Sequence, residues 1–225
     1  MTTPTRIPTA MADPATADLL RLSQWLSPAF PVGGYAYSHG LDWWIAERRL
    51  TEAAAIAGWL SDTLAHGAGR NDAILLSMTH RGAVAPAEAA DLAAALAASA
   101  ERWRETAAQG RAFLVLTNRL IGTGLSDLPL PVAVGAQARH LSLATETVLA
   151  LYLQAFAGNL VSVATRAVPL GQSEAQAVLA DLAPDIAAMA ADLATADLAD
   201  LGGAVPAGDL AAILHETQDV RLYLT

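Results

Sequence analysis

The sequence predicts an all-α protein, a single-domain bundle of roughly ten helices. Three observations predict this fold class. Alanine, the residue with the highest helix propensity, supplies much of a hydrophobic content of 54%. Apolar residues recur at helical spacing, as in Ile56, Trp59, Leu60 and Leu64. No segment shows the sustained alternation of β-branched and polar residues that is typical of a strand.

Caps and turn residues set the expected element order. Asp18 is expected to cap a first helix that ends before Pro28, and Ser173 with Gln176 is spaced like a capping box. Prolines and glycines in residues 27–34 and 122–131 interrupt the helical pattern. The further helices expected are Tyr37–Arg48, one starting near Thr51, Asp72–His80, Ala87–Ala100, Glu101–Leu120, Val132–His140, Leu143–Ala167, Ser173–Asp181, Pro184–Leu201 and Pro206–His215.

Three regions are expected along the chain. Residues 1–17, rich in threonine and proline, are expected to form a disordered lead-in. Residues 18–214 are expected to form the helical domain, and residues 215–225 a tail with little to pack on in its own domain. The lead-in lacks the basic start and apolar stretch of a secretory signal, so we expect a cytoplasmic protein.

The longest uncharged run lies between Glu146 and Arg166 and approaches the length of a membrane span. Gln154, Asn159 and Ser162 interrupt it with polar side chains. We therefore interpret this run as a buried central helix and expect no membrane partner.

Charge and missing residue types exclude several functions. A net charge of -9 disfavours binding to a nucleic-acid backbone. The chain has no cysteine, so thiolate nucleophiles and thiolate metal sites are excluded. All 13 basic residues are arginine, and a chain without lysine has neither a P-loop nor Schiff-base chemistry.

Histidines and aspartates offer weaker chemical signals. No two of the 5 histidines have the i, i+4 spacing that places two metal ligands on one helix face, so we expect no metal site and no cofactor. In a symmetric dimer one histidine could meet its own copy, and His39 is the best candidate. Asp192, Asp197 and Asp200 are interpreted as part of a solvated helix face, with an acid/base enzyme as the alternative.

The most unusual stretch is Phe30-Pro31-Val32-Gly33-Gly34-Tyr35-Ala36-Tyr37-Ser38-His39-Gly40-Leu41-Asp42. Its composition alone favours a helix-to-helix turn filled by aromatic side chains. The alternative is a small-ligand site in which the backbone N–H groups of the Gly33–Gly34 loop bind an anion.

Four stretches together resemble the UreF family of urease accessory proteins. They are the Phe30–Asp42 stretch, Gln109-Gly110-Arg111-Ala112, Arg166-Ala167-Val168-Pro169-Leu170-Gly171-Gln172, and the tail His215-Glu216-Thr217-Gln218-Asp219-Val220-Arg221-Leu222-Tyr223. They keep the family's order along the chain. Asp42 stands where the family usually has glutamate, and Leu224-Thr225 is an atypical ending.

The resemblance implies a homodimeric, non-catalytic chaperone. Its partners are UreD (also called UreH), the GTPase UreG and apo-urease, which receives nickel. The partner-binding residues it implies are Phe30, Tyr35, Tyr37 and His39 for the dimer or GTPase-facing surface, Arg111 and Arg166 as interface arginines, with Arg166 facing the GTPase, and His215, Glu216, Arg221 and Tyr223 for UreD.

Overall fold

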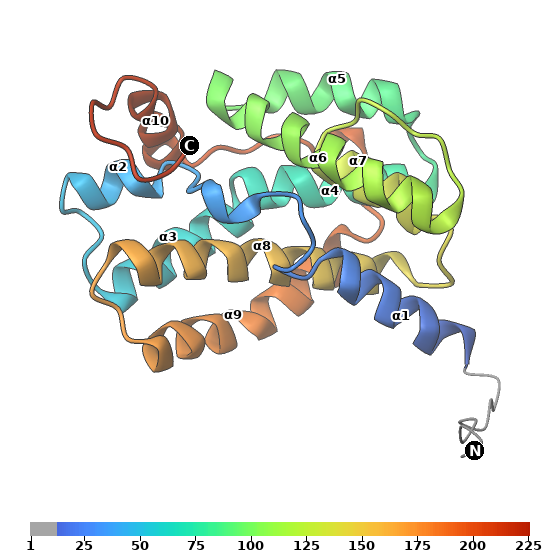
Figure 1. The fold of residues 1–225 in the computed structure, drawn as a ribbon, viewed down its shortest axis with the longest axis horizontal. Coiled ribbons are helices and arrows are strands. Elements are labelled where there is room, and N and C mark those ends of the chain that lie inside the picture. Colours follow the sequence, from blue (N-terminus) through green and yellow to red (C-terminus); the bar gives the residue numbers. More distant parts are fainter. Residues whose placement is uncertain (1–12) are drawn as a thin grey trace, which may run out of the picture.

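The structure is a computed structural model that describes residues 13–225 (Figure 1). Within these residues it contains ten α-helices and two short 3-10 helices and no β-strand, so the all-α prediction is confirmed. The elements are α1 Pro14–Trp25, η1 Gly34–Ala36, α2 Leu41–Ala46, α3 Ala53–Ala65, α4 Ala68–Arg81, α5 Pro86–Leu96, α6 Ala100–Ile121, α7 Leu130–Ala138, α8 Thr145–Ala167, α9 Gln172–Leu193, η2 Leu198–Asp200 and α10 Pro206–His215.

Helix α8 forms the centre of the bundle. It runs across the middle of Figure 1 and packs against α9, α4 and α3, and residues such as Val148, Leu149 and Leu153 are fully buried. By length and composition α8 is the one helix of the described chain that is apolar enough to cross a membrane. Its packing on neighbouring helices confirms the expected buried central helix.

Helix α1 begins earlier than expected. Asp13 is its N-cap and accepts a hydrogen bond from the backbone N–H of Ala15 (3.3 Å). The expected cap, Asp18, lies inside the helix, where its carboxylate accepts from Arg21 (2.8 Å) and from the N–H of Ser142 (2.7 Å). Residues 14–17 are therefore helical with Asp13 as their cap, and residues 1–12 of the expected lead-in lie outside the described residues.

The second helix is shorter than expected because two glycines before it adopt backbone angles that do not belong to an α-helix. Gly33 and Gly40 have φ values of 76° and 79°, in the left-handed region that favours glycine. Only α2 Leu41–Ala46 remains helical. A Cβ on Gly40 would lie 2.8 Å from the backbone nitrogen of Ala212, so this glycine also permits close contact between the start of α2 and α10.

Helix α9 replaces the two helices predicted on either side of Pro184. It continues through the proline, because buried residues such as Val178, Leu182 and Ile186 pack on the neighbouring helices and outweigh the cost of the proline. The predicted Ser173–Gln176 cap is also wrong. The side chain of Glu174 accepts instead from the N–H of Gly171, the actual N-cap (3.1 Å).

Candidate functional site

The C-terminal segment after α10 folds back onto its own domain. One carboxylate oxygen of Asp42 accepts the backbone N–H groups of Leu222 (2.8 Å) and Tyr223 (3.2 Å). The N–H of Leu224 donates to the carbonyl of Ala36 (2.8 Å). The expectation that this tail has little to pack on is therefore wrong. Local sequence patterns do not reveal this, because Asp42 and Leu222 are 180 positions apart.

Four charged side chains, Asp42, Glu101, His215 and Arg221, meet beneath the tail, and we call them the tail cluster. His215 is fully buried. Its Nδ1 lies 2.8 Å from Glu101 and its Nε2 lies 3.4 Å from Asp42. Arg221 donates to the other oxygen of Glu101 (2.6 Å). Two carboxylates thus face two cationic groups, which is the arrangement that makes buried charges tolerable.

The electrostatics of the tail cluster follow from these contacts. Burial alone would lower the pKa of His215, but its hydrogen bonds to Asp42 and Glu101 raise the pKa above the ordinary value. Burial would raise the pKa of Asp42, whereas the bonds from His215 and from the N–H groups of Leu222 and Tyr223 lower it. Both ring nitrogens of His215 face carboxylates, so the ring is best satisfied as an imidazolium.

A second polar cluster lies next to it and consists of His39, Arg102, Glu105, Gln109 and Thr225. Glu105 is bonded to Arg102, to Gln109 Nε2 (3.1 Å), to His39 Nε2 (2.9 Å) and to the Thr225 hydroxyl (2.8 Å). Burial opposes ionisation of Glu105, but Arg102 beside it lowers its pKa to about 2. Burial and Arg102 lower the pKa of His39, which is therefore neutral.

His39 is directed inward. Its side chain is 8% exposed, and its ring packs edge-on against Phe156 with 4.9 Å between centroids. A ring held in this way does not reach the surface. The structure therefore gives no support to contact between His39 and its copy across a dimer axis.

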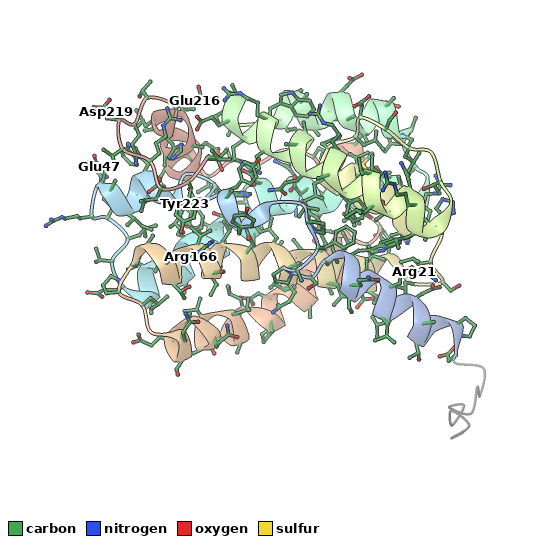
Figure 2. All side chains as sticks on the ribbon, in the orientation of Figure 1. Arg21, Glu47, Arg166, Glu216, Asp219 and Tyr223 are labelled. Carbon is green, nitrogen blue, oxygen red and sulfur yellow. The ribbon has the colours of Figure 1, made fainter. Side chains whose placement is uncertain are left out.

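Arg166 joins the tail to the Gly33–Gly34 loop. Its guanidinium lies over the ring of Tyr223, 5.5 Å from the centroid, and donates to the carbonyl of Tyr35 (3.0 Å). Figure 2 shows Arg166 on α8 beside Tyr223 of the tail. A surface hollow of about 560 Å³ lies here, and its lining residues are Tyr35, Ala36, Arg166, Arg221, Leu222, Tyr223 and Leu224.

The other expected partner-binding residues occupy different environments. Phe30 is buried against Phe113, with ring centroids 5.8 Å apart, so it fills the core rather than a surface. Tyr37 and Glu216 are half-buried, and the Glu216 carboxylate accepts the N–H of Glu101 (3.0 Å). Arg111 is exposed on α6.

The Gly33–Gly34 loop packs on the protein and uses its own N–H groups. Asn159 of α8 donates to the carbonyl of Gly34 (3.0 Å), and the N–H groups of Ala36 and Tyr37 donate to carbonyls within the turn. The contacts of Gly34, Ala36 and Tyr37 hold the segment as a turn packed on α8, as the turn interpretation expects.

Sequence reasoning missed the buried charged residues of α6. Glu101, Arg102 and Glu105 are all buried. Charged residues on a helix are typical of a solvated face, so their spacing gave no signal of burial. The aspartates proposed for acid/base chemistry, including Asp192 and Asp197, are exposed, as expected of a solvated face. No group of three or more histidine, aspartate or glutamate side chains suited to a metal ion occurs in residues 13–225.

The tail, the Phe30–Asp42 stretch and Arg166 therefore meet where the tail lies between α2, α6 and α8, and Gln109 of the remaining stretch contacts Glu105 of the neighbouring cluster. The family model for UreF matches residues 50–183, which is more than half of the chain. The chain belongs to the UreF family. Curated UreF proteins named urease accessory proteins align over nearly their whole length. That of Cereibacter sphaeroides (strain KD131) is 55% identical and covers 93% of this chain and 100% of the relative.

More distant UreF relatives align over the same extent. The protein of Dinoroseobacter shibae is 50% identical over 92% of this chain and 98% of its own length. That of Ruegeria pomeroyi is 42% identical over 96% of this chain and 100% of its own length. The UreF similarity thus extends beyond the residues that the family model matches.

Proposed function

We propose that this chain is a non-catalytic chaperone of urease maturation. It forms a cytoplasmic homodimer that bridges UreD and the GTPase UreG, so that nickel is inserted into apo-urease. The observation that carries the proposal is the surface above the tail cluster. Charged groups inside fix the tail, while apolar side chains such as Val220 and Leu222 point outward and are 77% and 68% exposed. Exposed apolar side chains around a fixed framework are typical of protein interfaces.

UreD is proposed to dock on the tail and α10. Apolar residues of both elements, including Leu210, Ile213 and Leu224, are exposed on the described chain. Their positions are fixed from below by Asp42 and Glu101. A surface of this kind needs little further ordering on binding, which limits the entropic cost of association.

The UreD proposal is tested by pull-down with Leu222→Ser and Arg221→Ala. Leu222→Ser alters only an exposed side chain, whereas Arg221→Ala also removes a partner of Glu101. Both are expected to reduce recovery of UreD at least about tenfold, the effect of roughly 1.4 kcal/mol. The control is Arg119→Ala, which replaces an exposed arginine at the far end of α6. Full recovery with Leu222→Ser would remove the tail from the UreD interface.

UreG is proposed to bind on the side of Arg166, at the edge of the dimer surface that contains Tyr35. Tyr35 is 67% exposed, and Arg166 is held by the Tyr35 carbonyl and the Tyr223 ring. Arg166→Ala is expected to abolish co-elution with GTP-loaded UreG in size-exclusion chromatography, because the guanidinium fork is lost. Arg111→Ala serves as a second interface variant and Arg119→Ala as the control. Unchanged co-elution of Arg166→Ala would place UreG elsewhere.

A homodimer is supported by the exposed Tyr35, since an aromatic side chain at the surface is typical of an interface. Light scattering coupled to chromatography would give the mass directly. The proposal expects twice the chain mass for the unmodified protein and a shift toward the monomer for Tyr35→Asp. A monomer at micromolar concentration in the unmodified protein would contradict it.

A further inference from the structure

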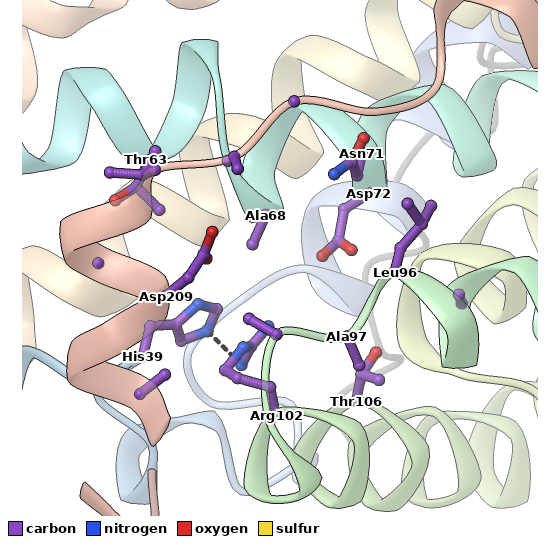
Figure 3. Close-up of a pocket in the computed structure, with 18 of the residues that line it drawn as sticks. His39, Thr63, Ala68, Asn71, Asp72, Leu96, Ala97, Arg102, Thr106 and Asp209 are labelled. Carbon is purple, nitrogen blue, oxygen red and sulfur yellow. Dashed lines mark hydrogen bonds between the residues drawn. The ribbon is translucent and has the colours of Figure 1, made fainter. Parts of the chain in front are cut away.

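A cavity of about 320 Å³ lies apart from the hollow beside the tail, between α3, α4, α6 and α10. Figure 3 shows two carboxylates facing the same space from different walls, Asp72 on α4 and Asp209 on α10. Arg102 and His39 form another side of the cavity. None of the contacts proposed for UreD or UreG uses this space.

The two carboxylates have no ion-pair partner among the described residues. Asp72 accepts a hydrogen bond from the hydroxyl of Tyr152 (2.9 Å), and Asp209 lies in the first turn of α10. Arg102, the cation closest at hand, already forms its ion pair with Glu105. Burial raises the pKa of Asp72 to about 6 and also raises that of Asp209. The lining therefore carries negative charge that its own residues do not balance.

Two further polar atoms at the cavity are buried and have no hydrogen-bond partner in the described chain, His39 Nδ1 and Trp59 Nε1. The side chain of His39 is 8% exposed, and so is Trp59. The Nε2 of neutral His39 lies 2.9 Å from both Glu105 and Arg102 Nη1 (Figure 3). In the tautomer that donates from Nε2 to Glu105, Nδ1 is an acceptor. Buried polar atoms are nearly always satisfied, so these two atoms mark a place for a polar molecule.

The chemistry of the lining selects a class of ligand. Asp72, Asp209 and His39 Nδ1 accept hydrogen bonds, whereas Trp59 Nε1 donates one. Three of these four groups favour a ligand with several donors, and the two carboxylates favour a positive charge. An anion would be repelled by both carboxylates. A metal ion does not fit, since the described residues supply no group of three ligands of the usual kinds.

We propose that this cavity binds a small alkylamine, and in particular a short diamine whose two ammonium groups are held by Asp72 and Asp209. One ammonium group also donates to His39 Nδ1. The methylene chain lies against the apolar lining, which includes Leu75 and Leu96. A diamine suits the site better than a monoamine because the two carboxylates come from different helices.

Such a ligand would connect α4 to α10. Helix α10 ends at His215, the buried imidazole of the tail cluster. A bound diamine therefore stabilises the position of the helix from which the tail departs. The proposal does not depend on which partner the tail binds.

The test compares three probes of equal chain length by calorimetry and thermal unfolding: putrescine with two ammonium groups, n-butylamine with one, and 1,4-butanediol with none. We expect saturable binding of putrescine with a rise in the unfolding midpoint. Binding of butylamine should be at least about tenfold weaker, and butanediol should not bind. No saturable binding of putrescine, or equal binding of butylamine, would overturn the proposal. Competition of putrescine by MgCl₂ at equal ionic strength would identify a metal site instead and would also overturn it.

Variants locate the site. Asp209→Asn keeps the shape of the residue and its place in α10, and we expect it to weaken putrescine binding at least about tenfold. Asp72→Asn is expected to do the same but also alters the bond to Tyr152, so its fold is checked first by circular dichroism. Asp192→Asn, an exposed aspartate on α9, is the control and should bind as the unmodified chain does. Unchanged binding in Asp209→Asn would exclude this cavity.

Discussion

At Asp42 a single carboxylate oxygen accepts two N–H groups of the tail and lies within 3.4 Å of His215. The short side chain of the aspartate reaches all three groups. On the other side of the ring, Glu101 contacts both His215 and Arg221. Because each member of the tail cluster satisfies another, removing one leaves a buried charge without its partner.

The raised pKa of His215 predicts a pH dependence of stability. A group whose pKa is higher in the folded state than in the unfolded state adds to the free energy of unfolding. For His215 this stabilisation is fully present below the unfolded pKa of 6.5 and is lost as the pH rises through the folded pKa. The free energy of unfolding in urea is therefore expected to fall between about pH 6.5 and the higher folded pKa. In His215→Gln this fall should be absent, and the variant should be least stable relative to the unmodified chain near pH 6.

His39 and His80 do not obscure this effect. Burial lowers the pKa of both histidines. Their titration therefore makes the free energy of unfolding rise with pH instead of fall, and it does so only below pH 6.5. A difference between His215→Gln and the unmodified chain that stays constant from pH 6 to pH 9 would contradict the assignment of an imidazolium.

At the scale of elements, two features determine how the helices pack: the close approach of α6 to the segment before α7, and the continuity of α9 through Pro184. Gly110 of α6 faces the segment before α7, where a Cβ would lie 2.0 Å from the carbonyl oxygen of Leu128. In α9 the chain remains helical through Pro184, which is exposed. Both features show how tertiary contacts outweigh local preferences.

Gly110→Ala is expected to destabilise the protein by about 2–4 kcal/mol, because the new methyl group collides with backbone that has no rotamer to change. Gly58→Ala is a matched substitution in α3, where a Cβ meets nothing within 4 Å. It should stabilise the protein by about 0.5–1 kcal/mol. Urea unfolding measures both, and a neutral Gly110→Ala would mean that α6 and α7 can separate at little cost.

Pro184→Ala is expected to raise the stability by about 1–3 kcal/mol. The substitution restores a backbone donor in the interior of α9 and removes the contact of the proline ring with the preceding turn. The side chain is exposed, so no core packing is lost. Thermal unfolding followed by circular dichroism at 222 nm is the measurement, and a lower midpoint would show that the proline shape is required by the packing of α9.

The elements also show what can be predicted from sequence. The bounds of α10, the central place of α8 and the all-α class follow from helix propensity and apolar spacing, which are local properties. The packing of Leu222 and Tyr223 on Asp42 does not, since it joins residues far apart in the chain. His39 was expected at a surface because an isolated histidine gives no sign of the buried Glu105 that holds it.

At the scale of the whole molecule, the net charge of -9 is distributed over a surface with few ion pairs. Of the ion pairs in the described residues, most involve buried side chains, and the pair between Arg21 and Asp18 is the most exposed. Mutual repulsion of surface carboxylates should therefore exceed the stabilising contribution of surface pairs, while the buried clusters are little affected by salt.

This charge distribution predicts that salt stabilises the protein. Raising NaCl from about 10 mM to 150 mM should increase the thermal midpoint by a few degrees, corresponding to about 1 kcal/mol for a chain of this length. Differential scanning calorimetry at pH 7 measures the change. A lower midpoint in salt would show that attractive surface pairs dominate instead.

The folding back of the tail has a consequence for how the protein is made. Asp42 leaves the ribosome long before Leu222, which follows it by 180 positions. Until then the carboxylates of Asp42 and Glu101 lack their tail partners, so the nascent chain cannot complete this part of its interior. Contacts between distant segments form late and slow the final step of folding. The surface proposed for UreD thus forms only after the tail has been synthesised, so an incomplete chain lacks this surface.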